Sequence, residues 1–123
     1  MTLESPDDQI EWFHRLAALP EEELRALAPT SERENFMDFI RAQLPGTSLP
    51  ELEEPQAFAE AVTALRANER KWNQALTRAL VEADDLARER RRTEAKELLV
   101  NFAAGCPWAL FKEVAENQAS WYQ

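Results

Sequence analysis

The sequence has very little glycine, cysteine and histidine, with 2, 1 and 1 residues respectively in a chain of 123. Sheet-rich folds depend on glycine in their tight turns and bulges, so we expect no mostly β fold. Because Cys106 stands alone, the chain cannot form an internal disulfide, which fits the reducing cytoplasm where we expect the protein to reside. Glu11 and His14 have the Glu-x-x-His spacing of di-iron bundles, but such a site needs two histidines. We therefore expect no metal and no other cofactor.

The sequence also lacks a long apolar run. No segment approaches the roughly 20 residues that a membrane-spanning helix requires. The opening residues, MTLES, lack the basic and apolar parts of a secretory signal. Hydrophobic residues make up 45% of the chain and charged residues 30%, which is typical of folded proteins. We expect one folded domain with a modest core and no membrane association.

Basic residues are the minority, and they are unevenly distributed. The chain has 14 Lys and Arg against 23 Asp and Glu, a formal net charge of −9. Residues 1–60 carry 14 acidic and 4 basic side chains, net −10, whereas residues 61–123 carry 9 acidic and 10 basic, net +1. Three interpretations stay open. The halves complement each other within a chain or across a dimer, the acidic half meets a basic partner, or its acidic faces are simply solvated.

Helix signals fill the N-terminal third of the chain. Pro6 suits the first position of a helix that ends before Pro20, and Pro20 begins a short second helix. Ser31 and Glu34 match the S-x-x-E capping box, which predicts a third helix up to residue 44. Apolar residues recur at helical spacing in the first and third of these segments.

A loop rich in proline follows this helical segment. Residues 45–55 contain three prolines and one glycine, so they form the longest predicted loop and the only plausible internal boundary. We interpret residues 1–44 as an acidic N-terminal helical subdomain. Residues 56–123 then form a long helix with C-terminal helices, and all parts pack as a single domain.

The segment after Pro55 predicts one long helix. It has no proline or glycine until Gly105. Apolar or small residues recur every three or four positions, interrupted only at Glu69, which is typical of a helix with a narrow packing stripe. We expect a turn near 90–93, where the pattern loses phase, a left-handed cap at Gly105 and a last helix from Pro107. The stripe consists of Phe58, Val62, Leu65, Trp72, Leu76, Ala79, Ala83 and Leu86.

The length of this helix bears on assembly. A helix over residues 55–91 spans roughly 55 Å at about 1.5 Å per residue. A compact domain of this size has a diameter of only about 35 Å. We therefore expect part of the stripe to be exposed and covered by a second chain, in a homodimer or a larger complex.

No arrangement of residues points to catalysis. Cys106 precedes a predicted helix N-terminus, which can activate a thiol, but its apolar neighbours indicate a buried and unreactive side chain. The chain contains no phosphate-binding loop, nucleophile elbow, zinc motif or dinucleotide fingerprint. An enzyme is thus the last of the functional classes that we consider, and we expect none.

Candidate binding residues fall into a basic cluster and a set of aromatic side chains. The cluster is a solvated helix end, a contact for acidic groups of a partner or of this chain, or a phosphate site. Nucleic acid is the least favoured ligand, since the protein is acidic and the cluster lacks interleaved aromatic residues. Aromatic side chains often anchor interfaces, although burial in the core is the simpler expectation for each. The candidates are Arg88, Arg90, Arg91, Arg92, Trp72, Trp121 and Tyr122.

These observations predict an all-α protein of five or six helices around one long central helix, as a helical bundle or helical hairpin. We expect a non-catalytic protein–protein interaction module, such as an adaptor, small chaperone, antitoxin or immunity-type inhibitor. Its acidic face would steer a basic partner and its aromatic residues would anchor the contact. The alternative is a structural subunit of a larger assembly, such as a ribonucleoprotein, that uses the Arg88–Arg92 cluster on phosphate.

Overall fold

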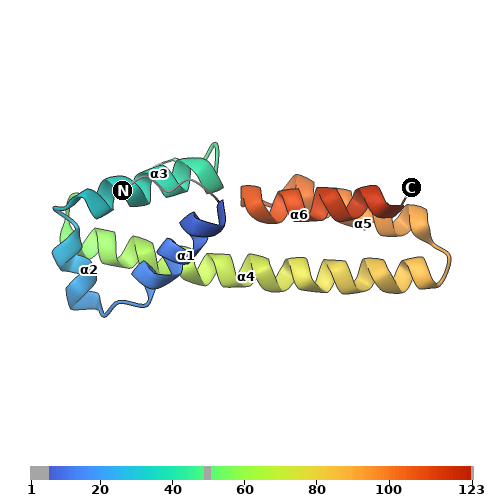
Figure 1. Cartoon of the computed structure of the whole chain (residues 1–123), viewed down its shortest axis with the longest axis horizontal. Helices are drawn as coiled ribbons and strands as arrows, with labels where there is room; N and C mark the ends of the chain where they lie inside the picture. Colours follow the sequence, from blue (N-terminus) through green and yellow to red (C-terminus); the bar gives the residue numbers. More distant parts are fainter. Residues whose placement is uncertain (1–5, 49–50, 123) are drawn as a thin grey trace. The chain divides into compact units, whose positions relative to one another are not determined.

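A computed structural model describes residues 6–48 and 51–122, and all regular secondary structure in these ranges is helical (Figure 1). The prediction of an all-α helical bundle with one long central helix is confirmed. Within the described ranges, none of the helices combines the length and the apolar character needed to cross a bilayer. The helices are α1 (Pro6–Ala17), α2 (Glu21–Leu27), α3 (Ser31–Gln43), α4 (Pro55–Arg88), α5 (Arg92–Gly105) and α6 (Ala109–Ala119), followed by the 3-10 turn η1 (Ser120–Tyr122).

The residues group into two compact units, 1–68 and 69–123. The boundary between them lies inside α4, which contributes its first part to one unit and its second part to the other. The loop predicted at 45–55 does separate α3 from α4. Its role as the border of an N-terminal subdomain stays a prediction. Each unit has its own core.

The core of the first unit is aromatic. Phe13 of α1 stacks on Phe39 of α3, with ring centroids 4.6 Å apart, and Phe36 of α3 meets Phe58 of α4 edge-on at 5.6 Å. These four side chains are at most 3% exposed. Edge-on and offset contacts between rings stabilise a core beyond the area that they bury. The apolar faces of α1, α3 and the start of α4 therefore converge on one cluster.

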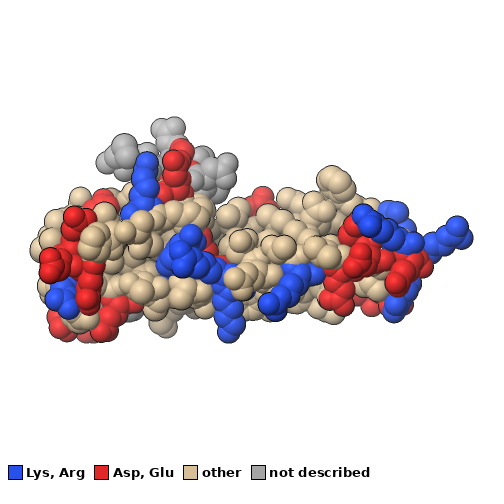
Figure 2. Space-filling model, turned by 90° about the horizontal axis from the view of Figure 1, so that it is seen from below, with Lys and Arg blue, Asp and Glu red and all other residues tan. Residues whose placement is uncertain are grey.

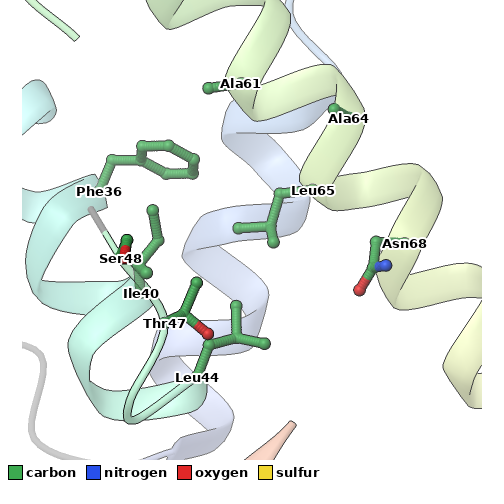
Figure 3. Close-up of a pocket in the computed structure, with 9 residues that line it drawn as sticks. All are labelled: Phe36, Ile40, Leu44, Thr47, Ser48, Ala61, Ala64, Leu65 and Asn68. Carbon is green, nitrogen blue, oxygen red and sulfur yellow. The ribbon is translucent and has the colours of Figure 1, made fainter. Parts of the chain in front are cut away.

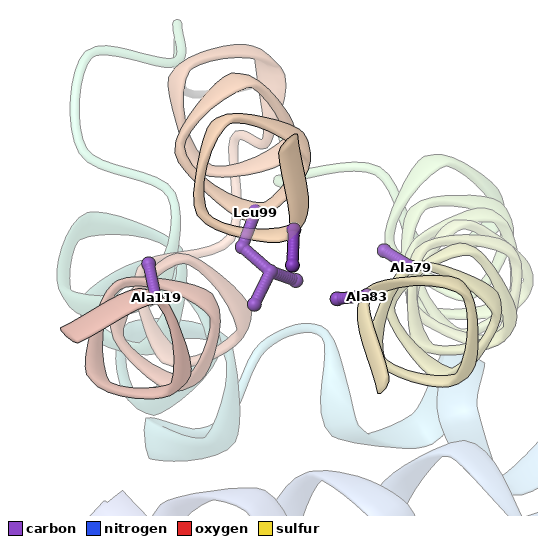
Figure 4. Packing of buried hydrophobic residues seen from close by; sticks show 5 residues of the cluster. Ala79, Ala83, Leu99 and Ala119 are labelled. Atoms are coloured by element: carbon purple, nitrogen blue, oxygen red, sulfur yellow. The ribbon is translucent and has the colours of Figure 1, made fainter. Parts of the chain in front are cut away.

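One buried cluster in the second unit is built mainly from small side chains. Ala79 and Ala83 of α4 point toward Leu99 of α5 and Ala119 of α6 (Figure 4). Ala95 of α5 completes the buried cluster. Because alanine side chains are short, they let neighbouring helices approach closely. The C-terminal part of α4 thus packs with α5 and α6.

The expected exposure of the apolar stripe on α4 is wrong. Phe58, Val62 and Ala83 are fully buried within the chain, and Leu76 and Ala79 are at most 7% exposed. The length argument assumed one compact core, whereas α4 supplies its stripe to two cores in succession. Dimerisation stays a prediction, without the support of an exposed stripe.

The predicted turn between the long helix and the next segment is confirmed, and it ends α4 in a Schellman motif. The N–H of Arg91 donates to the carbonyl of Leu86 at 2.8 Å, and the N–H of Arg90 donates to Ala87 at 3.0 Å. Arg90 has a φ of +64°. This left-handed position usually holds glycine, because a Cβ atom crowds the backbone there.

Two expectations about the last helix need correction. Gly105 is the final residue of α5 and does not have a positive φ, so the left-handed cap predicted there is wrong. The chain instead leaves α5 through Cys106 in an extended conformation, with φ −88° and ψ 125°. The last helix begins at Ala109 rather than Pro107, because Trp108 is also extended and stands before the first helical turn.

The cap of α3 lies one residue earlier than predicted. Thr30 has an extended backbone, and its side chain accepts a hydrogen bond from the N–H of Glu32 at 3.2 Å. Ser31 is already the first helical residue. An N-cap residue must be non-helical, so Ser31 cannot fill the position that the S-x-x-E pattern assigns to it.

Candidate interaction surface

The hairpin of α5 and α6 brings together two of the regions that the sequence marks as candidates. Arg92 begins α5, and Trp121 and Tyr122 follow α6 in the turn η1. The Nη2 atom of Arg92 donates a hydrogen bond to the carbonyl of Trp121 at 2.8 Å, and its Cζ atom lies 5.9 Å from the centre of the Tyr122 ring. We call Arg90, Arg92, Trp121 and Tyr122 the basic–aromatic surface.

Trp121 provides the exposed apolar part of this surface. Its side chain is 70% exposed, the largest value among the exposed large hydrophobic residues in the described ranges. Tyr122 beside it is half-buried and packs against the core of the second unit. The Trp121 backbone is therefore anchored by Arg92 and by Tyr122, while the indole ring faces solvent.

Two of the four clustered arginines form ion pairs within the chain. Arg88 pairs with Asp84 at 3.0 Å, one helical turn earlier on α4. Arg91 pairs with Glu89 at 3.4 Å and also with Glu94. The hydrogen bond and the charge of Glu94 raise the pKa of the Arg91 guanidinium above its ordinary value. The Arg88 pair therefore lies within α4, whereas Arg91 links the turn to the start of α5.

The other two arginines keep donors for a ligand. Neither Arg90 nor Arg92 forms an ion pair with the residues that the structure describes. A guanidinium has five N–H donors, and the bond to the Trp121 carbonyl uses one of those on Arg92. The contact with Tyr122 holds the guanidinium plane in place by a cation–π interaction.

The local charge around the surface is balanced. Residues 84–97 include five acidic and five basic side chains, so the segment has no formal net charge. Figure 2 shows Lys and Arg interspersed with Asp and Glu at the end that carries the turn between α4 and α5. The surface therefore offers individual cations rather than an extended positive field.

Trp72, the remaining sequence candidate, is not part of this surface. It is half-buried and meets Phe102 of α5 edge-on, with ring centroids 5.9 Å apart. It precedes Arg88 by 16 residues of the same helix, which is roughly 24 Å at about 1.5 Å per residue. The other two tryptophans, Trp12 and Trp108, are core residues, at 8% and 0% exposed.

A cavity in the first unit was not expected from the sequence. It has a volume of about 360 Å³, lies between α3 and α4, and is mainly apolar (Figure 3). The signal that could have revealed it is the pair Ala61 and Ala64, whose small side chains face larger ones on α3. Its lining residues are Phe36, Ile40, Leu44, Thr47, Ser48, Ala61, Ala64, Leu65 and Asn68.

Cys106 and His14 are the residues that the sequence offers as candidates for catalysis or metal binding. Cys106 is 7% exposed, and burial raises the pKa of its thiol above the ordinary value. The Nε2 atom of His14 lies 3.1 Å from Nη1 of Arg66. Because arginine only donates, His14 accepts this hydrogen bond on Nε2. Within the described ranges, no three His, Cys, Asp or Glu residues are placed to hold a metal ion.

The contact between Arg92 and Trp121 was missed, although the sequence contains a signal for it. The segment between α5 and α6 is centred near residue 107, and residues 92 and 121 lie almost equally far from it along the chain. In an antiparallel hairpin such residues come together.

Comparisons with family models, curated proteins and solved structures give no match. The geometry of the chain itself therefore carries the functional argument.

Proposed function

We propose that this chain is a non-catalytic protein–protein interaction module whose partner contacts the basic–aromatic surface. The observation that carries the proposal is the 70% exposed Trp121, held on a backbone that Arg92 anchors. Tryptophan and arginine are the residue types that most often dominate the binding energy of an interface. A backbone that is already held in place loses less conformational freedom on binding.

The acidic N-terminal half supports a second element of the proposal. Its net charge of −10 over residues 1–60 would speed the encounter with a partner that has a basic region. Such steering weakens as salt screens the charges. We further propose a cytoplasmic location, where a free thiol such as that of Cys106 stays reduced.

The test is affinity capture of the tagged full-length chain from a lysate of its source cells. Three chains are compared: the unaltered protein, Trp121→Ala and the control Val81→Ala, which removes another exposed apolar side chain from the second unit. We expect the same stoichiometric protein partner with the unaltered chain and with Val81→Ala, and its loss with Trp121→Ala. Capture that is indifferent to Trp121, or that yields no stoichiometric protein, contradicts the proposal.

A structural subunit of a larger assembly, such as a ribonucleoprotein, is the second candidate. The observation in its favour is that Tyr122 supplies an aromatic ring beside Arg92, which the basic cluster lacks in the sequence itself. This candidate predicts RNA in the captured material and binding that falls steeply with salt. It also predicts that binding disappears when Arg90, Arg91 and Arg92 are all changed to alanine.

A further inference from the structure

We propose that the basic–aromatic surface recognises a carboxylate that stands next to an aromatic or aliphatic side chain in an acidic segment of a partner protein. This inference rests on the proposed function and adds the chemistry of the group that is bound. The carboxylate would accept hydrogen bonds from Arg92, supported by the charge of Arg90. The apolar neighbour would cover Trp121.

Arg92 is already arranged for such a contact. Its hydrogen bond to the Trp121 carbonyl and its position over the Tyr122 ring both restrain the guanidinium. Four N–H donors are left, and a carboxylate can accept two of them in parallel. Because the side chain is ordered before binding, the contact loses little conformational entropy.

The apolar side chain that we expect beside the carboxylate of the partner follows from the position of Trp121. Its carbonyl oxygen lies 2.8 Å from Nη2 of Arg92, so the indole belongs to the residue that the guanidinium touches. In the proposed complex, a ligand held by Arg92 would place a neighbouring side chain on the exposed ring of Trp121. Burial of that ring supplies the area that a single ion pair at a surface lacks.

Arg90 gives a second and independent indication. It occupies the left-handed position of the Schellman motif, where glycine fits better than any residue with a Cβ atom. Its side chain is exposed and makes no ion pair with the described residues, so nothing within them explains an arginine at this place. Backbone strain of this kind is often associated with function. Because Arg90 lies two residues before Arg92 in the chain, its charge would add to the attraction for an acidic group.

The charge balance favours a discrete carboxylate over a nucleic acid. A phosphate backbone is held by many cations that act together, and its binding depends on an extended positive field. Here residues 84–97 are neutral overall, and Glu89 and Glu94 lie beside the arginines. Repulsion from these two acids weakens the binding of a polyanion, which must lie along the whole segment. It weakens the binding of a single carboxylate less, because that contact is a short-range bidentate pair at Arg92.

The experiment is selection of binding peptides from a random decapeptide library on the full-length chain. The baits are the unaltered protein, Arg92→Gln, Trp121→Ala and the control Arg78→Gln, an exposed arginine of α4 outside the surface. We expect the unaltered chain and the control to enrich peptides in which Asp or Glu adjoins an aromatic or aliphatic residue. Both variants of the surface should lose this enrichment while their helical circular dichroism is unchanged.

A second measurement quantifies the contact and keeps the test independent of folding defects. The best peptide is synthesised with its acid and with the corresponding amide, and the amide should bind at least tenfold more weakly. Arg92→Lys keeps the positive charge but loses the planar pair of N–H donors of the guanidinium, so it should also weaken binding. Failure to enrich any peptide, enrichment without an acidic residue, or tighter binding of a twelve-residue uridine RNA than of the peptide would overturn the inference.

The outcomes separate this inference from the proposed function. If capture from lysate depends on Trp121 but the selected peptides need no acid, the module binds protein and the inference about the carboxylate is wrong. If neither capture nor peptide binding depends on Trp121, both are wrong. Selection of acidic peptides that depends on both Arg92 and Trp121 supports both.

Discussion

Arg90 illustrates, for a single residue, how backbone geometry can conflict with residue type. Its φ of +64° belongs to the left-handed region, and two hydrogen bonds of the Schellman motif hold it there. For residues other than glycine this conformation costs on the order of 1 kcal/mol. The chain accepts this cost at a site where the side chain faces solvent.

Replacing Arg90 with glycine should therefore stabilise the protein. We expect Arg90→Gly to raise the free energy of unfolding by about 0.5 kcal/mol, since the gain in the turn is partly offset by greater freedom of the unfolded chain. The control Arg78→Gly places glycine at an exposed position inside α4 and should lower it by about 1 kcal/mol. Urea unfolding followed by circular dichroism measures both. Equal destabilisation by the two variants would refute the assignment of strain to Arg90.

Cys106 predicts a dependence of stability on pH. Burial raises the pKa of its thiol in the folded state, so above the pKa of the unfolded thiol the unfolded chain releases a proton that the folded chain retains. Stability should therefore be unaffected below about pH 8.5 and should fall as pH rises toward the folded-state pKa, by at most about 1.4 kcal/mol per pH unit. Unfolding midpoints between pH 7 and 10 test this. Cys106→Ala should remove this part of the loss, and a parallel decline of both chains would contradict the prediction.

At the scale of residues, the sequence pattern predicts which side chains are buried better than it predicts which residues contact each other. Trp12 and Trp108 lie in strongly periodic apolar segments, and both are buried. Trp121 follows the same spacing yet is 70% exposed, because the helix ends at Ala119 and the chain turns into η1. Its contact with Arg92 joins residues 29 positions apart, which a local pattern does not report.

At the scale of elements, α3 shows what fixes the start of a helix. Thr30 caps it with a side-chain hydrogen bond to the N–H of Glu32. We expect Thr30→Ala to lower the free energy of unfolding by about 1 kcal/mol, because that N–H then loses its partner. Ser31→Ala should change it by only a few tenths. Thermal unfolding of both variants tests this, and a larger loss for Ser31→Ala would restore the capping box that the sequence pattern suggests.

The helices themselves were largely predictable, and their ends less so. The stripe that begins at Phe58 specified α4, and loss of its phase located the turn before α5. Proline placed the starts of α1 and α2 within one residue. Gly105 and Pro107 were misleading, since the chain leaves α5 in an extended conformation rather than through a left-handed residue.

For the whole molecule, the sequence defined the fold class but not the number of cores. The stripe on α4 was expected to need a second chain, because one compact core was assumed. The structure instead contains an aromatic core around Phe13 and a second core that includes the cluster around Ala83, and α4 contributes to both. The uneven charge pattern is compatible with this arrangement in a single chain. Its proposed role is to speed the encounter with a partner.

The interaction surface belongs to this largest scale, because a partner must cover it. Hydroxyl-radical labelling of the captured complex and of the free chain, read by mass spectrometry, compares the reactivity of the four tryptophans. We expect Trp121 to be labelled fastest in the free chain and to be protected several-fold in the complex, while half-buried Trp72 is unchanged. Equal labelling of Trp121 in both states, with the partner still bound, would show that the interface lies elsewhere.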